Sequence, residues 1–115
     1  MSIGIIDSYD DPNAESDLVV FDQQFGLPSC TTANGCFRKI FGGSKRPKAS
    51  AGWALEISLD IEWAHAIAPK ATILLVEATT NSLGDLLSGV DGAQRRLRCL
   101  DELDRLRILE RIAPG

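Results

Sequence analysis

The sequence of 115 residues contains one histidine, three cysteines and no long apolar run. A transmembrane helix needs about 20 consecutive apolar residues, whereas the longest run here lies around Ile73–Val76. Basic residues are fewer than acidic ones, and the net charge of -4 gives no basis for binding nucleic acid or an anionic membrane. With 44% hydrophobic and 24% charged residues, the composition is typical of a single soluble globular domain.

A secretion signal is another feature that the sequence lacks. The first residues, MSIGIIDSYDD, have neither a basic start nor a long apolar stretch. Residues typical of a strand begin at Ile3, so we expect the written start to lie inside a larger protein.

The three cysteines match no zinc-binding motif. Cys30 and Cys36 bracket a loop of small polar residues, and Cys99 stands alone far downstream. The first two could close a disulfide that stabilises the fold by about 2 kcal/mol, or they could remain reduced thiols. The redox state of the compartment decides between the two, so the spacing leaves both open.

Short apolar segments alternate with amphipathic ones along the chain. We expect strands over residues 2–7, 36–40 and 71–78, and helices over residues 13–26, 51–68 and 82–90. Pro69 ends the second helix, and Ser82 and Asp85 fit a capping box that begins the third. Strands this apolar, separated by helices, predict an α/β domain with a parallel sheet.

The chain changes character from Gln94 onward. This segment holds six arginines, and leucine recurs at every third position from Leu97 to Leu109. The pattern fits either a charged amphipathic helix or a disordered extension. We favour the extension because nothing upstream indicates where a helix would dock. We therefore divide the chain into a folded portion, residues 1–93, and a divergent tail, residues 94–115.

Two acids, Glu56 and Asp60, lie four residues apart in the predicted second helix. At 100° per residue, Ser58, Glu62 and His65 fall within an arc of about 60°, which predicts a solvated stripe. The two acids point the opposite way. The residues expected beside them on that drier side are Trp53, Trp63, Ala64 and Ile67.

Burial of two neighbouring carboxyls has a chemical consequence. Desolvation and repulsion favour protonation of at least one of them, and the two would titrate as a coupled pair. Such a pair can act as a general base at acidic pH, where a histidine is already protonated. The alternative is that both acids only neutralise a basic residue or a helix end.

Other polar residues are weaker candidates. His65, on the predicted wet stripe, is more simply an exposed polar residue than a catalytic base. Asp10 and Asp11 are expected in a turn that leads into the first helix. Asp7 ends the first strand, and this edge of a parallel sheet is where sites gather, so its role stays open.

The segment ALEISLDIEWAHAIAPKATILLVEA resembles the catalytic domain of the sedolisins, the serine-carboxyl peptidases, particularly kumamolisin-like bacterial members. The resemblance extends over about Ile3–Gly92. It implies a partial subtilisin-like parallel sheet flanked by helices, with Glu56 as general base and Asp60 as its supporting acid. It also implies protein or peptide substrates, hydrolysis at acidic pH and an extracellular location.

The chain departs from the family pattern in several places. The family's nucleophile lies in a Gly-Thr-Ser motif, which does not occur here, and the oxyanion aspartate in an Ala-Gly-Asp type segment is also missing. The family's calcium site lies in the missing carboxyl-terminal part, so we expect no cofactor in this chain. Loss of the nucleophile lowers the rate on the order of a million-fold. We therefore expect this chain alone to be inactive.

Three other interpretations compete. A true subtilase would need a His-Gly-Thr motif where this sequence has WALEISLD. A receiver-like signalling module would need a phosphoacceptor aspartate where the third strand carries Glu77. A non-catalytic α/β remnant would expose an unpaired sheet edge and self-associate through it.

Overall fold

The computed structural model describes the backbone of residues 1–112 and the side chains of residues 1–100. Its elements follow the order β1 (Ser2–Ser8), α1 (Ala14–Phe25), β2 (Phe37–Phe41), α2 (Ala51–Ile67), β3 (Thr72–Ala78) and α3 (Leu83–Ile112). The predicted strands and the first two helices are confirmed to within a residue or two at their ends.

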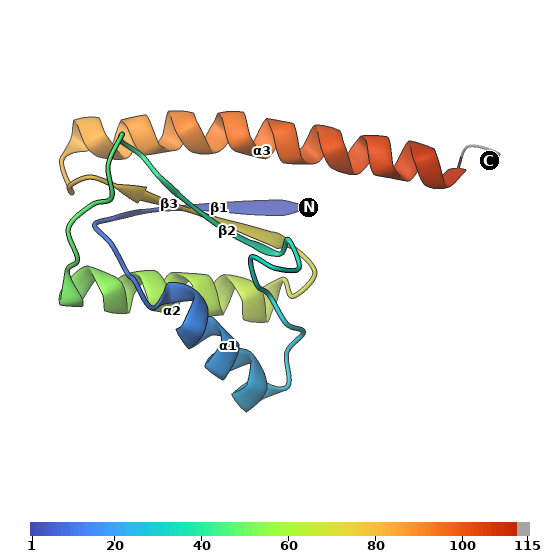
Figure 1. The fold of residues 1–115 in the computed structure, drawn as a ribbon, viewed down its shortest axis with the longest axis horizontal. Helices are drawn as coiled ribbons and strands as arrows, with labels where there is room; N and C mark the ends of the chain where they lie inside the picture. The colour runs from blue at the N-terminus through green and yellow to red at the C-terminus, as the bar shows by residue number, and fades with distance from the viewer. Residues whose placement is uncertain (113–115) are drawn as a thin grey trace.

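The three strands form one parallel sheet in the order β1-β3-β2. Helices α1 and α2 cover one face and α3 covers the other, as Figure 1 shows. The fold is therefore an α/β parallel sheet flanked by helices, as the sequence predicts. Among the helices that the structure describes, none is both long and apolar enough to cross a bilayer.

The central strand β3 is almost completely buried and supplies both cores. Ile73 and Leu75 face α1 and α2, where they pack with Leu18, Ile57 and Ile61. Leu74 and Val76 point to the opposite face and pack beneath α3. Burial on both faces explains why this segment reads as a continuous apolar run instead of an alternating one.

Local signals set the helix ends. The Ser50 side chain accepts a hydrogen bond from the Trp53 backbone N–H at the start of α2. Gly26, with φ of 66°, ends α1 in the left-handed region that favours glycine. Ser82 Oγ accepts from the Asp85 N–H, which confirms the predicted start of α3.

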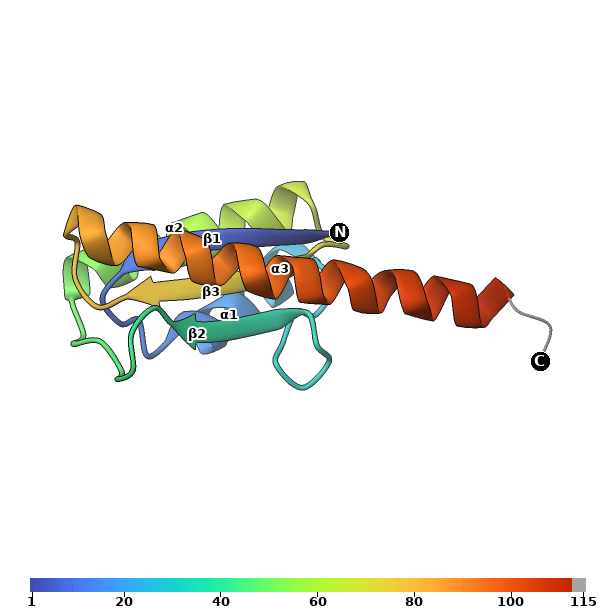
Figure 2. The ribbon, with the colours of Figure 1, turned by 90° about the horizontal axis from the view of Figure 1, so that it is seen from above.

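Helix α3 is much longer than predicted. It passes through Gln94 without a break and continues to Ile112, extending beyond the sheet in Figure 2. Glycines provide the docking surface that the sequence did not reveal, because α3 approaches β1 closely. A Cβ atom at Gly4 would lie 3.0 Å from Leu97 Cδ1, and one at Gly89 would lie 2.9 Å from Ile6 Cγ2. The preference for a disordered extension was therefore wrong for the backbone of residues 94–112.

Cys30 and Cys36 form a disulfide, which settles the alternative that their spacing left open. The bond closes the loop before β2, and Cys30 belongs to the core between the sheet and α1 and α2. Cys99 is a free, exposed thiol on α3.

Candidate acidic site

Acidic residues end two neighbouring strands at the carboxyl edge of the sheet. Asp7 of β1 and Glu77 of β3 are register partners. Two residues earlier, Ile5 and Leu75 face the core beneath α1 and α2. Because side chains alternate along a strand, Asp7 and Glu77 point to that same side. Both are buried, with 7% and 0% of their surface exposed.

Asp7 lies beside Asp60 of α2, the helix that covers this face of the sheet. Burial, a side-chain hydrogen bond with Asp60 and the negative charges of Asp60, Glu56 and Glu77 raise the pKa of Asp7 to about 8. Asp7 therefore holds a proton at neutral pH. The sequence left the role of Asp7 open, because apolar residues lie on both sides of β1 and only the structure shows that Asp7 shares the side of Ile3 and Ile5.

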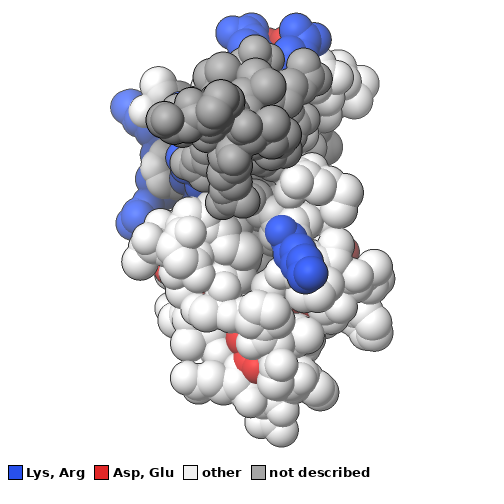
Figure 3. All heavy atoms as spheres, turned by 90° about the vertical axis from the view of Figure 1, so that its right-hand side faces the viewer, with Lys and Arg blue, Asp and Glu red and all other residues white. Residues whose placement is uncertain are grey.

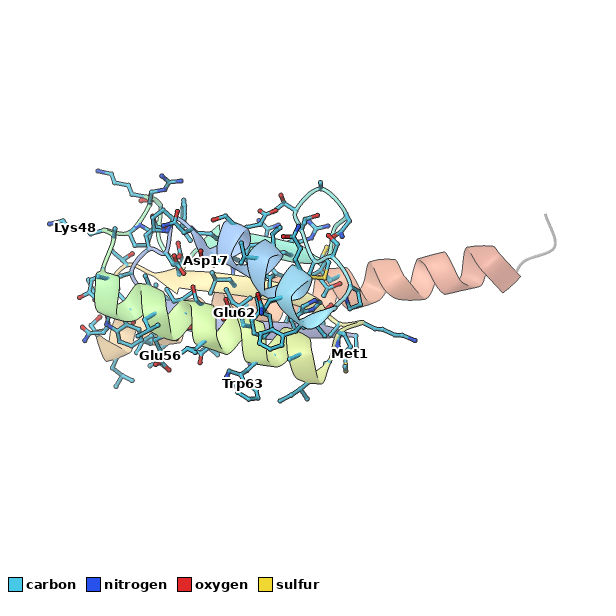
Figure 4. All side chains as sticks on the ribbon, turned by 90° about the horizontal axis from the view of Figure 1, so that it is seen from below. Met1, Asp17, Lys48, Glu56, Glu62 and Trp63 are labelled. Carbon is cyan, nitrogen blue, oxygen red and sulfur yellow. A yellow bond between two sulfur atoms is a disulfide. The ribbon has the colours of Figure 1, made fainter. Side chains whose placement is uncertain are left out.

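Glu56 lies at the solvent boundary of this group. The prediction that Glu56 is buried together with Asp60 was wrong, because the Glu56 side chain is exposed. Together with Asp7, Gly52 and Trp53 it lines an open pocket of about 560 Å³. Figure 4 shows Glu56 on the side of α2 that faces away from α1. The pocket thus presents one solvent-accessible carboxylate beside one buried, proton-holding carboxyl.

The predicted faces of α2 were wrong. Trp63 and Ile67, expected to shield the acid pair, are 64% and 78% exposed. The buried face instead consists of Ile57, Ile61 and His65, spaced four residues apart. The helix is apolar around most of its circumference, so the periodicity of its apolar residues did not indicate which side is buried against the core. Asp60 is half-buried because it lies beside β1.

His65 was predicted to be exposed and is completely buried. Its Nε2 lies 2.8 Å from the Pro28 carbonyl oxygen and 3.1 Å from Asp22 Oδ1. Glu62, from the same predicted stripe, is half-buried toward α1, where burial raises its pKa (Figure 4). His65 is thus a core residue and lies apart from the acidic pocket.

A second group of charges adjoins the first. Ser58 Oγ donates to Asp11 Oδ2, and the Asp11 N–H donates to Glu77 Oε2. Lys39 Nζ donates to Asp10 Oδ1 and to the Asp11 carbonyl oxygen. Asp11 begins the turn into α1, as predicted, but its contacts also fix the loop after β1. These contacts within the protein hold the loop after β1 in place, although Glu77 Oε1 has no hydrogen-bond partner in the described part of the chain and only the Lys39 ammonium lies near it.

The acidic site lies at one end of the strands. Figure 3 views the end of the molecule where the strands begin, and few acidic side chains appear there outside the part that grey atoms cover. The acidic site lies at the opposite end, where the strands finish. In a parallel sheet this is the edge at which ligand sites gather.

No protein-family model, curated protein or solved structure matches the chain in the comparisons. The catalytic roles of Glu56 and Asp60 therefore remain predictions that rest on the quoted motif and on the geometry of the acidic site.

Proposed function

We propose that the chain is the amino-terminal part of a serine-carboxyl peptidase domain that hydrolyses proteins or peptides at acidic pH. In this proposal Glu56 is the general base, and Asp60 orients it and shares its proton. Asp7 is a third, buried acid beside Asp60. The observation that carries this proposal is the contact between Asp7 at the end of β1 and Asp60 on α2, beside the exposed Glu56.

The arrangement suits acid chemistry. A general base must be ionised at the working pH and must reach the proton that it removes. Glu56 opens onto the pocket, whereas a histidine base would be protonated in acid. Asp7, which lines the same pocket, keeps its proton because burial and the neighbouring acids raise its pKa to about 8.

The chain alone supplies only the carboxyl half of this mechanism, so we propose that it is inactive by itself. An extracellular location follows from the family resemblance and is supported by the Cys30–Cys36 disulfide, since such bonds persist in oxidising compartments.

Complementation tests the proposal. The chain is mixed with a carboxyl-terminal fragment of a kumamolisin-like domain that contains the Gly-Thr-Ser nucleophile, and assembly is verified by size-exclusion chromatography. We expect the complex to hydrolyse a chromogenic peptide near about pH 4, and each fragment alone to be inactive. Glu56→Gln should abolish the activity, whereas the matched change Glu62→Gln, toward α1, should retain it. An assembled complex without activity, or one insensitive to Glu56→Gln, contradicts the proposal.

The receiver-like alternative gains no support. Glu77 ends the central strand, where a phosphoacceptor would lie, but it is fully buried. Its two carboxylate oxygens face Lys39 Nζ at 3.3 Å and the Asp11 N–H at 2.8 Å. A carboxylate held in this way is not available to a phosphoryl donor.

A further inference from the structure

A cluster of sulfur and nitrogen atoms lies away from the acidic site, between the loop before β2 and helix α2. Cys30 Sγ, Cys36 Sγ and a ring nitrogen of His65 all lie within 4.8 Å of one another. Cys30 and His65 are fully buried. No zinc motif is visible in the sequence because His65 is distant from the two cysteines along the chain, and only the fold brings the three residues together.

Hydrogen bonding prepares one nitrogen of His65 as a ligand. Nε2 faces two acceptors, the Pro28 carbonyl oxygen and Asp22 Oδ1, so Nε2 carries the ring proton. Nδ1 is then the nitrogen with the free lone pair, and it is buried without a hydrogen-bond partner within the described part of the chain. Histidines that bind metals almost always donate their other N–H to a carbonyl or carboxylate in this manner.

We propose that reduction of the Cys30–Cys36 disulfide converts this cluster into a binding site for a thiophilic divalent cation such as Zn²⁺. A phosphine reductant breaks the S–S bond and becomes a phosphine oxide, taking its oxygen from water, whose two protons pass to the two sulfurs. The cation then displaces the two thiol protons and binds both thiolates and Nδ1 of His65.

The surroundings suit a tetrahedral ion. Zn²⁺ takes sulfur ligands at about 2.3 Å and nitrogen ligands at about 2.0 Å, and three protein ligands leave a fourth position for water. A pocket of about 650 Å³, lined in part by Pro28 and Cys36, opens beside the cluster. Of the three ligands only Cys36 lines this pocket, so Cys36 is the side from which an ion would reach the cluster.

Cobalt binding tests the site directly. The full chain carrying Cys99→Ser is reduced with a phosphine without oxygen and titrated with Co²⁺, while circular dichroism monitors the fold. We expect one equivalent to bind with a thiolate-to-cobalt charge-transfer band and intense tetrahedral d–d bands, and Zn²⁺ to displace it. The oxidised chain should show none of these bands. Absence of the bands in the reduced chain, or the same bands in the oxidised chain, would overturn the proposal.

Two further measurements separate this site from loose thiol binding. Adding Cys36→Ser to the Cys99→Ser chain should abolish the cobalt spectrum, whereas the chain with Cys99→Ser alone keeps it. Because His65 is the only histidine, its ¹⁵N imidazole resonances report without ambiguity. We expect Zn²⁺ to shift Nδ1 while Nε2 keeps its proton. Unchanged imidazole resonances in the zinc-loaded chain, or a reduced chain that unfolds and is not refolded by Zn²⁺, contradict the proposal.

Discussion

Lys39 Nζ lies 2.7 Å from Asp10 Oδ1, and this ion pair ties the loop after β1 to the edge strand β2. The same ammonium group lies 3.3 Å from Glu77 Oε1 on the central strand. The Lys39 ammonium group therefore forms ion pairs with two buried acidic side chains that are distant from each other in the sequence.

Lys39→Met should destabilise the fold by about 3 kcal/mol, because breaking a buried pair leaves an uncompensated charge. Urea unfolding at neutral pH measures the change in the free energy of unfolding. Lys48→Met, at an exposed position, is the matched control and should cost less than about 0.5 kcal/mol. Equal effects of the two changes would show that the Lys39 pair contributes nothing specific.

The pH dependence of stability should reflect Asp7. Folded Asp7 keeps its proton up to about pH 8, whereas the ordinary pKa of the group is 3.8. Between these values the native state binds more protons than the unfolded state, so stability falls as the pH rises. Burial also raises the pKa of Glu77, to about 7, and this shift likewise makes the stability fall as the pH rises.

Asp7→Asn should therefore flatten this profile. We expect stability on the order of 2 kcal/mol higher than the wild type at about pH 8, and little difference at about pH 4. Urea unfolding across this range provides the measurement, with the exposed Asp91→Asn as control. An equal loss of stability at both pH values would show that Asp7 is ionised in the folded chain.

The disulfide should stabilise the fold by constraining a short loop. Cys36→Ser is expected to lower the free energy of unfolding by about 2 kcal/mol, since the bond joins residues only six apart. Thermal unfolding in the presence of a chelator measures this loss without interference from bound metal. Cys99→Ser, at the exposed thiol, should leave the melting temperature unchanged.

The side of α2 that faces the core can be tested by comparing substitutions of His65 and Trp63. His65→Ala should cost about 3 kcal/mol, because it removes a buried ring and its hydrogen bond to Pro28. Trp63→Ala truncates a larger side chain but one that is mostly exposed, and should cost less than about 1 kcal/mol. The opposite ranking would restore the orientation that the helical wheel predicts.

Sequence reasoning succeeded where the signals are local. Ser50, Gly26 and Ser82 set helix ends through backbone geometry and hydrogen bonds within a few residues, so their effects can be read without a fold. It failed on the face of α2 because apolar residues surround most of that helix. It also ended α3 too early, because Leu97 of α3 packs against Gly4 of β1, a contact between residues far apart in the sequence.

The sequence by itself determined the alternation of strands and helices, the placement of Glu56 and Asp60 one helical turn apart, and the acid at the end of β1. Only the tertiary structure decided that Asp60 meets Asp7, that Glu56 stays in solvent, and that His65 lies beside Cys30 and Cys36. The reason is physical: caps, turns and strand propensity act over a few bonds, whereas burial and pKa depend on which distant surfaces pack together.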